Sequence, residues 1–272
     1  MKKNYINNLF QEMNIQKISL SHLKEVSKLK LKKYREETNS FLIESEKILI
    51  EALRSDWHLM EVYLTRDNFR LINQLQEFQS FENCKIFELS KKEFKKISNE
   101  ITPSGIGAIV EKKKFDLNSI LKMKNKLIPV FERISDPGNL GTIIRSADWF
   151  GFDAIVLSKN SVEITNPKVI KASMGSIFHL QFFEEVDLSI FIDQMKKNNY
   201  KILGTTTKGK DVSKFTFKEN YLLIFGNESM GISKEILNLC DELITIPKFG
   251  SAESLNLAIS ASIFFYELRK NV

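Results

Sequence analysis

The sequence is poor in the residues that hold metals and disulfides. It has 2 cysteines, Cys84 and Cys240, which form no C-x-x-C pair, and only 3 histidines. We therefore expect neither a zinc site nor a disulfide framework, and a reducing cytosol suits this composition. The longest apolar segment, near the C-terminus, is interrupted by Glu267 and Lys270, and no hydrophobic run follows the first three residues. We expect no signal peptide and no transmembrane span.

The remaining composition is that of an ordinary globular protein. The chain has 272 residues, of which 43% are hydrophobic and 27% charged, so it suits one large domain or two modest ones. We expect most of its 21 phenylalanines in the core, because burial of aromatic area stabilises a fold. The net charge of +6 favours an anionic partner, although many basic proteins bind nothing acidic.

The first half alternates between helical and extended patterns. Ser19 or Ser21 can cap a first helix, Ser45 a second, and Ser90 with Glu93 forms a capping box for a helix that ends near residue 98. A further helix is expected over residues 68–78. Strands are expected at residues 41–43, 60–64, 84–89 and 106–110. We assign residues 1–115 to a smaller α/β domain.

The second half alternates more regularly. Strands are expected at 127–134, 154–157, 180–183, 200–205, 221–225 and 243–246, with helices between them and a last helix over 254–270. This order predicts an α/β domain with a largely parallel sheet, which we assign to residues 125–272.

Basic residues concentrate between residues 24 and 35, at 91–96 and at 112–114. A solvated helix face is the simpler explanation of each cluster, and neutralisation of phosphates is the functional one. On the second hypothesis, the first cluster supplies the RNA-binding side chains Lys28, Lys30, Lys32, Lys33 and Arg35.

Three segments of the second half carry the chemistry. In the first, from Asp136 to Arg145, a turn with two glycines leads into a helix, and backbone amides at a helix start attract anions. In the second, from Leu222 to Gly231, a buried strand ends in a Gly-Asn-Glu turn, the place where open α/β sheets bind ligands. In the third, from Ile246 to Ala258, Ser254 or Ser251 is expected to open the final helix. Asn256 would lie in its first turn, where asparagine is a poor helix former.

In this order the segments resemble the three motifs of the SpoU (TrmH-like) class of RNA ribose methyltransferases. The matching residues are Asn139, Gly141 and Arg145; Gly226, Glu228 and Gly231; and Ile246, Pro247, Ser254 and Asn256. The first half is similar, more loosely, to the ribosomal-protein-like RNA-binding domain that precedes the catalytic domain in many members. Glu253 brings a negative charge near an RNA site, for which we have no explanation.

The resemblance implies a knotted SPOUT-type domain, in which a C-terminal trefoil knot forms the S-adenosylmethionine pocket. The implied cofactor-binding residues are Gly204, Thr205, Thr206, Phe225, Gly226, Asn227, Gly231, Ile246, Pro247 and Leu255. It also implies a homodimer through the C-terminal domain, with the active site completed at the interface. No metal is implied, because the methyl donor is a sulfonium.

The resemblance further implies a catalytic set of Arg145, Asn139, Glu228, Ser254 and Asn256. A guanidinium is almost never deprotonated, so we expect Arg145 to position an RNA phosphate and to stabilise the developing alkoxide. Glu228 would either fix the cofactor loop or pair with Arg145.

These residues predict a cytoplasmic enzyme that methylates a ribose 2′-hydroxyl, in ribosomal RNA or alternatively in transfer RNA. A catalytically silent RNA-binding protein of ribosome assembly is the competing hypothesis. A nucleotide-dependent Rossmann enzyme has little support, since no G-x-G-x-x-G follows the first strand.

Overall fold

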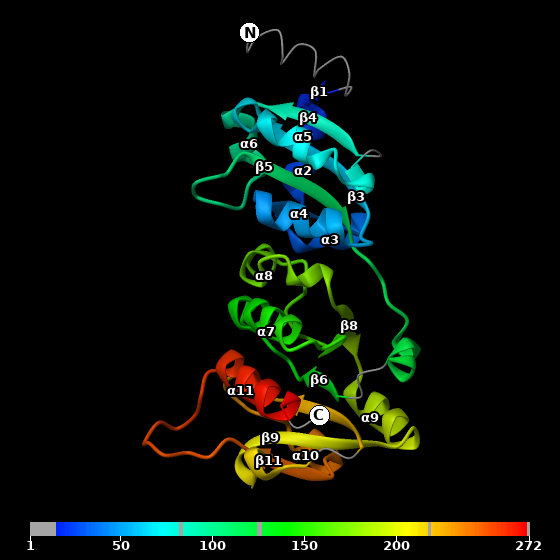
Figure 1. Cartoon of the computed structure of the whole chain (residues 1–272), viewed down its shortest axis with the longest axis vertical. Coiled ribbons are helices and arrows are strands. Elements are labelled where there is room, and N and C mark those ends of the chain that lie inside the picture. The colour runs from blue at the N-terminus through cyan, green and yellow to red at the C-terminus, as the bar shows by residue number, and fades with distance from the viewer. Residues whose placement is uncertain (1–14, 82–83, 124–126, 217–218, 271–272) are drawn as a thin grey trace. The chain divides into compact units, whose positions relative to one another are not determined.

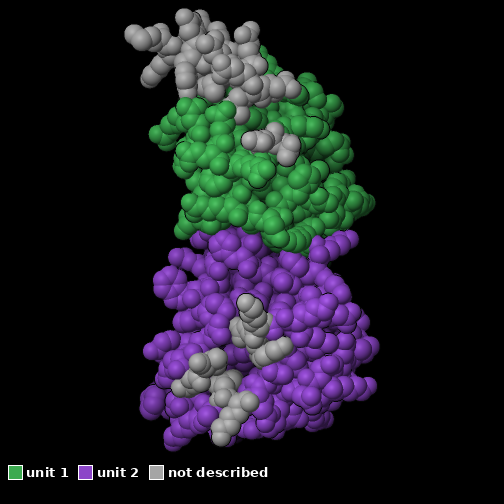
Figure 2. Space-filling model, turned by 45° about the vertical axis from the view of Figure 1, so that its right-hand side comes forward, with its two compact units in different colours: residues 1–113 green, residues 114–272 purple. Residues whose placement is uncertain are grey.

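The chain divides into two compact units, residues 1–113 and 114–272, which Figure 2 distinguishes by colour. A computed structural model describes residues 15–81, 84–123, 127–216 and 219–270. No helix within these ranges is long and apolar enough to cross a membrane. Each unit has its own sheet and its own core, so each is described separately.

The sheet of unit 1 has the strand order β1-β4-β3-β5-β2. Its strands are β1 (Gln16–Lys17), β2 (Ser40–Glu44), β3 (Leu59–Thr65), β4 (Lys85–Leu89) and β5 (Ile106–Glu111). The strands β1, β4 and β3 run parallel, and β5 runs antiparallel between β3 and β2. The carboxyl ends of three parallel strands therefore share one edge of this sheet.

Three of the helices of unit 1 begin at serines that the sequence indicates. The helices of this unit are α2 (Leu20–Lys28), α3 (Lys32–Thr38), α4 (Glu46–Arg54), α5 (Ile72–Leu75) and α6 (Lys91–Ile97), shown in Figure 1. Ser19, Ser45 and Ser90 accept hydrogen bonds as N-caps of α2, α4 and α6, and Ser90 with Glu93 forms the expected capping box. Apolar residues of α2 and α6 pack together over Tyr63 and Phe87 of the sheet.

The prediction of one helix over residues 68–78 is wrong for most of that range. A 3₁₀ helix over Arg66–Leu71 precedes the single α-helical turn of α5, and another 3₁₀ turn covers Gln79–Phe81. The Asn68 amide donates to the carbonyls of Ser104 and Gly105, so this side chain ties the segment to a neighbouring loop. Such side-chain bonds to the backbone compete with a regular helix.

The sheet of unit 2 has the order β11-β9-β10-β6-β7-β8, and every pairing is parallel. Its strands are β6 (Leu127–Phe131), β7 (Ala154–Ser158), β8 (Gln181–Val186), β9 (Tyr200–Asp211), β10 (Asn220–Phe225) and β11 (Glu242–Thr245). All five residues of β6 are buried, as expected for a parallel strand covered on both faces. The α/β fold class predicted from the alternating pattern is confirmed.

Helices cover both faces of this sheet. They are α7 (Pro137–Trp149), α8 (Pro167–Ser173), α9 (Leu188–Lys197), α10 (Lys234–Leu239) and α11 (Leu257–Arg269), with 3₁₀ turns over Leu117–Lys122, Ser176–Phe178 and Val212–Lys214. On one face, α9 and α10 pack on Ile128, Val130 and Ile224. On the other face, Phe131 stacks on Phe225 with ring centroids 4.8 Å apart, and Phe264 of α11 closes over them.

Two boundaries differ from those expected. The last helix begins at Leu257 and not at Ser254, because Asn256 is its N-cap. The strand β9 continues to Asp211, but its register with β11 jumps from Leu243↔Gly204 to Ile244↔Lys210. The intervening residues 205–209 therefore lie between two stretches of pairing.

Candidate active site

The candidate site lies where the chain reverses its direction of travel across the sheet of unit 2. From β6 the chain proceeds to β7 and β8 on one side, and the later strands β10, β9 and β11 lie on the other side. The strands β6 and β10 are neighbours, with Phe131 paired to Phe225. A crevice at the carboxyl ends of such a strand pair is the usual ligand site of open α/β sheets.

The turn after β10 is built by its two motif glycines. A Cβ on Gly226 would come within 2.0 Å of the Gly231 carbonyl carbon, so no larger residue fits there. Gly231 has a φ of +66°, a conformation that favours glycine. The backbones of Asn227 and Gly231 exchange two hydrogen bonds, and the Asn227 Oδ1 accepts from the amides of Ser229 and Met230. The turn is therefore closed by its own residues.

Glu228 joins this turn to the segment that enters α7. Its carboxylate accepts hydrogen bonds from the amides of Ser135 and Asp136, at 3.2 and 3.0 Å, and from the Ser135 hydroxyl. The Asn139 Nδ2 and the Asn227 Nδ2 add a fourth and a fifth bond, each at 3.3 Å. Burial raises the pKa of Glu228, but these hydrogen bonds outweigh burial and hold the pKa below its usual value. Glu228 is therefore an anionic clamp, and among the described residues it forms no ion pair with Arg145.

The start of α7 presents its first motif residues in fixed positions. Asp136 is the N-cap and accepts from the Asn139 amide at 2.7 Å, while Pro137 occupies the first turn. A Cβ on Gly141 would lie 2.4 Å from the Ala172 Cβ, so this glycine permits the close packing of α7 on α8. Gly141 thus has a packing role, while Asn139 faces the clamp.

Asn256 connects the third motif to the first. Its Oδ1 caps α11 by accepting from the amides of Ala258 and Ile259, and its Nδ2 donates to the Asn139 Oδ1 at 2.9 Å. The expectation that Ser254 or Ser251 caps this helix is wrong. Asparagine is as good an N-cap as serine, and its additional amide group can bond a second helix. One hydrogen-bonded chain therefore runs from Asn256 through Asn139 to Glu228.

Arg145 lies on a different face of α7. It is exposed and shares that face with Thr142 and Trp149, which lie three residues before and four residues after it. The Trp149 side chain is 84% exposed. Within the described ranges Arg145 has no hydrogen bond or ion pair. Its guanidinium is therefore available to an external anion.

The third motif lies mostly in an exposed loop. Figure 1 shows the segment between β11 and α11 as a long loop that extends away from the sheet. Ile246 and Pro247 are half-buried at its start, whereas Glu253, Ser254 and Leu255 are exposed. The structure places Ser254 outside the hydrogen-bonded chain that contains Asn256.

The residues implied for the cofactor follow three adjacent strands. Gly204 pairs with Ile224 of β10 and with Leu243 of β11, so the ends of β9, β10 and β11 lie side by side. Thr205 and Thr206 follow Gly204 and are half-buried, and the Thr205 hydroxyl donates to the Ile224 carbonyl. This edge offers backbone groups, small side chains and the apolar pair Ile246 and Pro247. The residues present therefore fit a bound nucleoside sulfonium such as S-adenosylmethionine.

The basic cluster of unit 1 differs from the expected phosphate-binding surface. Arg35 is buried, with 5% of its surface exposed, and its Nη1 donates to the carbonyls of Leu29 and Lys30. It therefore holds the turn between α2 and α3 and offers no charge to RNA. The exposed lysines have acidic neighbours: Lys28 pairs with Glu25, Lys32 with Glu36 and Lys33 with Glu37. Lys30 is half-buried.

Ser135 and Asp136 contact Glu228, and the sequence did not predict either residue as part of the site. Their amides bind Glu228 across more than 90 residues of chain, so no local pattern marks the pair. The Asp-Pro dipeptide that starts a helix after a strand is the one signal that was present. Among the described residues, no three His, Cys, Asp or Glu side chains are grouped so that they could hold a metal.

Comparison with known proteins gives the same assignment for both units. Residues 126–266 match the SpoU rRNA Methylase family, and residues 21–108 match the MRM3-like substrate binding domain. The chain is 33% identical over 248 residues to RlmP of Bacillus subtilis (strain 168), named a 23S rRNA (guanosine(2553)-2′-O)-methyltransferase. The alignment covers 91% of this chain and 95% of that protein.

Solved structures agree over nearly the whole length. An AdoMet-bound rRNA methyltransferase from Sinorhizobium meliloti is 27% identical, with a TM-score of 0.85 over 95% of this chain and 98% of that one. The SpoU methyltransferase AviRb of Streptomyces viridochromogenes, in complex with AdoMet, is 25% identical, with a TM-score of 0.82 over 93% and 98%. On its three linked motifs and the match over more than half its length, this chain belongs to the SpoU rRNA methylase family.

Proposed function

We propose that the chain methylates a ribose 2′-hydroxyl in structured RNA with S-adenosylmethionine as the methyl donor. The observation that carries this proposal is the chain of hydrogen bonds from Asn256 through Asn139 to Glu228, which joins one residue from each of three motifs. Ribosomal RNA is the favoured substrate, because relatives that span the chain are named for it. Transfer RNA is the alternative.

The residues of the chain have separate tasks in this reaction. When bound, the sulfonium supplies an activated methyl group. Arg145 holds the RNA phosphate beside the target ribose and stabilises negative charge as it develops on the 2′-oxygen, a contact that is strongest in the transition state. Asn139, fixed by Glu228 and Asn256, offers neutral hydrogen bonds that orient the ribose. Ser254 joins them when the loop closes on the substrate. The proton passes to the adjacent RNA phosphate or to water.

The cofactor would be held by Gly204 to Thr206, Phe225 to Asn227 with Gly231, and Ile246, Pro247 and Leu255. The tight backbone at Gly226 and the adjacent strand ends support this pocket. We further propose that the chain segments around it form the trefoil knot that the family resemblance implies.

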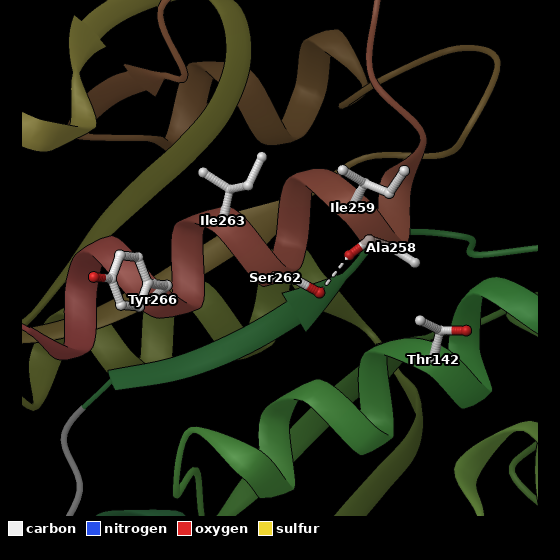
Figure 3. Close-up of a pocket in the computed structure, with 6 residues that line it drawn as sticks. All are labelled: Thr142, Ala258, Ile259, Ser262, Ile263 and Tyr266. Atoms are coloured by element: carbon white, nitrogen blue, oxygen red, sulfur yellow. Dashed lines mark hydrogen bonds between the residues drawn. The ribbon is translucent and has the colours of Figure 1, made fainter.

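The working protein would be a homodimer through α7 and α11. A groove of about 400 Å³ lies between these helices. Figure 3 shows its residues, with Thr142 on α7 across from Ala258, Ile259, Ser262, Ile263 and Tyr266 on α11. Ile259 and Tyr266 are 55% and 54% exposed. An apolar surface of this kind is typical of an interface between copies.

This placement of the interface accounts for the position of Arg145. The arginine lies on the exposed face of α7, beside Thr142, which lines the groove. In a dimer formed through this groove, Arg145 of one subunit would lie next to Asn139 and Asn256 of the other. The interface would thus complete the active site.

Unit 1 would be the RNA-docking domain and residues 114–272 the methyltransferase domain, acting together in the cytoplasm. Support comes from the match of residues 21–108 to a substrate-binding domain and from exposed lysines on α6. Lys92, Lys95 and Lys96 have no ion pair within the described ranges. They can therefore neutralise phosphates more readily than the paired lysines of α3.

Mapping of 2′-O-methyl groups on bulk RNA, after incubation with the full chain and S-adenosylmethionine, tests the proposal. We expect one principal new site in ribosomal RNA. We also expect S-adenosylmethionine to bind the chain with unchanged affinity in EDTA. Calorimetry of cofactor binding distinguishes the silent alternative: a chain that binds RNA but neither binds S-adenosylmethionine nor modifies any RNA would be an assembly protein.

A further inference from the structure

A polar cleft lies entirely within unit 1, which carries none of the three motifs. It has a volume of about 490 Å³ and opens at the shared edge where the parallel strands β1, β4 and β3 end. Its polar lining includes Lys17, Thr65, Arg66, Glu88, Ser90 and Lys91. The size is that of a pocket for a small ligand or a single nucleotide.

Glu88, the next-to-last residue of β4, is the unusual member of this lining. Its side chain is only 8% exposed. One carboxylate oxygen accepts from the Arg66 Nε, but the other, Oε2, is buried without a hydrogen-bond partner among the described residues. A buried carboxylate oxygen without a donor is costly, because burial removes the water that would have bonded it. A ligand that brings a donor to this oxygen would remove that cost.

Arg66 presents the complementary group. Its side chain is 65% exposed, and its contact with Glu88 uses the Nε alone. The terminal Nη groups have no other partner within the described residues. The Glu88 carboxylate thus anchors the guanidinium while leaving its outer edge open, and that edge can bond two oxygens of one phosphate.

The other charges of the cleft are balanced. Lys91 is paired with Asp67 at 2.7 Å, and Glu93 is engaged in the capping box of α6. Lys17 is exposed and lacks an ion pair within the described part of the chain. A site with both signs does not favour a bare anion over other ligands. It favours a ligand that carries a phosphate and a hydrogen-bond donor a few ångströms apart.

We propose that this cleft binds one nucleotide of the substrate RNA, with its phosphate on Arg66 and an N–H or O–H donor of the same nucleotide on Glu88. The proposal rests on the RNA-docking role proposed above for unit 1 and names a subsite within it. The donor is either the ribose 2′-hydroxyl or an amino or imino group of the base. Unit 1 would then select a nucleotide and not merely attract the RNA backbone.

The test uses the full chain with labelled Ile and Leu methyl groups, because Ile18 and Leu89 line the cleft. Guanosine 5′-monophosphate and inorganic phosphate are each titrated while these two methyl signals are followed. The dissociation constant for guanosine 5′-monophosphate should be at least tenfold lower than that for inorganic phosphate. Deoxyguanosine 5′-monophosphate removes the 2′-hydroxyl, and inosine 5′-monophosphate removes the base amino group. Whichever loses affinity identifies the donor. Cytidine, adenosine and uridine 5′-monophosphates determine which base is preferred.

Two variants and one matched control complete the design. Arg66→Ala and Glu88→Gln should each weaken nucleotide binding and RNA binding at least fivefold, with S-adenosylmethionine affinity unchanged. Arg54→Ala is the control, because Arg54 is equally exposed and pairs with Glu51, yet is not part of the cleft. It should leave both affinities unaltered.

Inorganic phosphate bound as tightly as every nucleotide would overturn the proposal, as would methyl signals of Ile18 and Leu89 that no nucleotide moves. Equal RNA affinities for Arg66→Ala and Arg54→Ala would also overturn it. Nucleotide binding is measured without methyl transfer. A chain that fails to methylate RNA but binds nucleotides here would contradict the proposed enzymatic activity and leave the cleft in place.

Discussion

The turn after β10 and the loop after β11 both carry family motifs, yet the two are held in opposite ways. In the turn, Asn227 and Gly231 bond each other and Glu228 bonds the entry to α7. In the loop, residues 248–255 are exposed and make no hydrogen bond among the described residues, and the Phe249 side chain is 97% exposed.

This difference separates two kinds of motif residue. Contacts within one subunit account for the residues of the turn, because these residues close the turn and orient Asn139. The exposed residues of the loop and Arg145 have no contacts within the subunit that would account for them. Their contacts must come from cofactor, RNA or a second copy of the chain. A variant in the turn should therefore change stability, and a variant in the loop should change activity alone.

Arg145→Ala should have the largest effect. We expect methyl transfer to fall by about 10²–10³-fold, as for loss of a contact to charge that develops in the transition state. Cofactor affinity, measured by calorimetry, should stay within about threefold, because Arg145 lies on α7 and is not among the residues of the strand ends that we propose to hold the cofactor. A variant that retains more than a tenth of the activity would remove Arg145 from the mechanism.

Glu228→Gln should reduce both stability and activity. We expect a loss of about 1–2 kcal/mol in the free energy of unfolding, since the charged acceptor of five hydrogen bonds becomes neutral. The pKa of Glu228 is lower in the folded state than its ordinary value of 4.5. Its stabilisation is therefore complete above that value and disappears as the pH falls through the folded pKa.

Denaturant unfolding between pH 3 and 7 measures this contribution. The wild type should lose more stability than Glu228→Gln as the pH falls below about 4.5. Glu235→Gln is the control, because Glu235 is an exposed residue outside the clamp. Identical pH profiles for wild type and Glu228→Gln would show that the carboxylate does not hold the turn.

Asn256→Ala should cost about 1 kcal/mol, because α11 loses its N-cap. Asn256→Ser keeps a cap but has no amide to bond Asn139. We therefore expect near-normal stability for the serine variant, with methyl transfer reduced in both. If Asn256→Ser were as unstable as Asn256→Ala, the residue would not act mainly as a cap. Full activity in the serine variant would remove the bond to Asn139 from the mechanism.

Loop variants should have the smallest effect on stability. Phe249→Ser and Ser254→Ala should change the free energy of unfolding by less than about 0.5 kcal/mol, as is usual for exposed positions. Ser254→Ala should nevertheless slow methyl transfer. Thermal unfolding without ligand checks the first statement, and an assay of methyl transfer checks the second. A large loss of stability in the absence of ligand would show that the loop packs on its own subunit.

The alternation of apolar segments predicted most of the architecture. The strands β7 and β10 each contain a short apolar run between helical patterns, residues 154–157 and 221–225, so their place in a parallel sheet followed from periodicity. Burial of charge could not be predicted in the same way. Arg35 belongs to a basic cluster by sequence, yet its guanidinium bonds two carbonyls inside unit 1. Only tertiary packing distinguishes such a residue from a surface cation.

The sequence predicted which residues the site contains but not which of them bond one another. Pattern matching named Asn139, Glu228 and Asn256, while the bonds among them span 89 and 117 residues of chain. No local rule shows which of several nearby polar residues caps a helix, so the sequence indicates Ser254 or Ser251 where Asn256 has that role. The oligomeric state has no local signature either, because it depends on which exposed apolar side chains share a face.

Mixed dimers test the central claim, that each subunit holds a preformed cluster and receives Arg145 from its partner. The variants Arg145→Ala and Asn139→Ala, each inactive alone, are unfolded together, refolded as a mixture and assayed for methyl transfer. If Arg145 acts across the interface, half the dimers are mixed and each has one intact site, so about a quarter of wild-type activity returns. If Arg145 acts within its own subunit, every site in the mixture lacks one residue. Activity that stays at the level of the single variants would contradict the account.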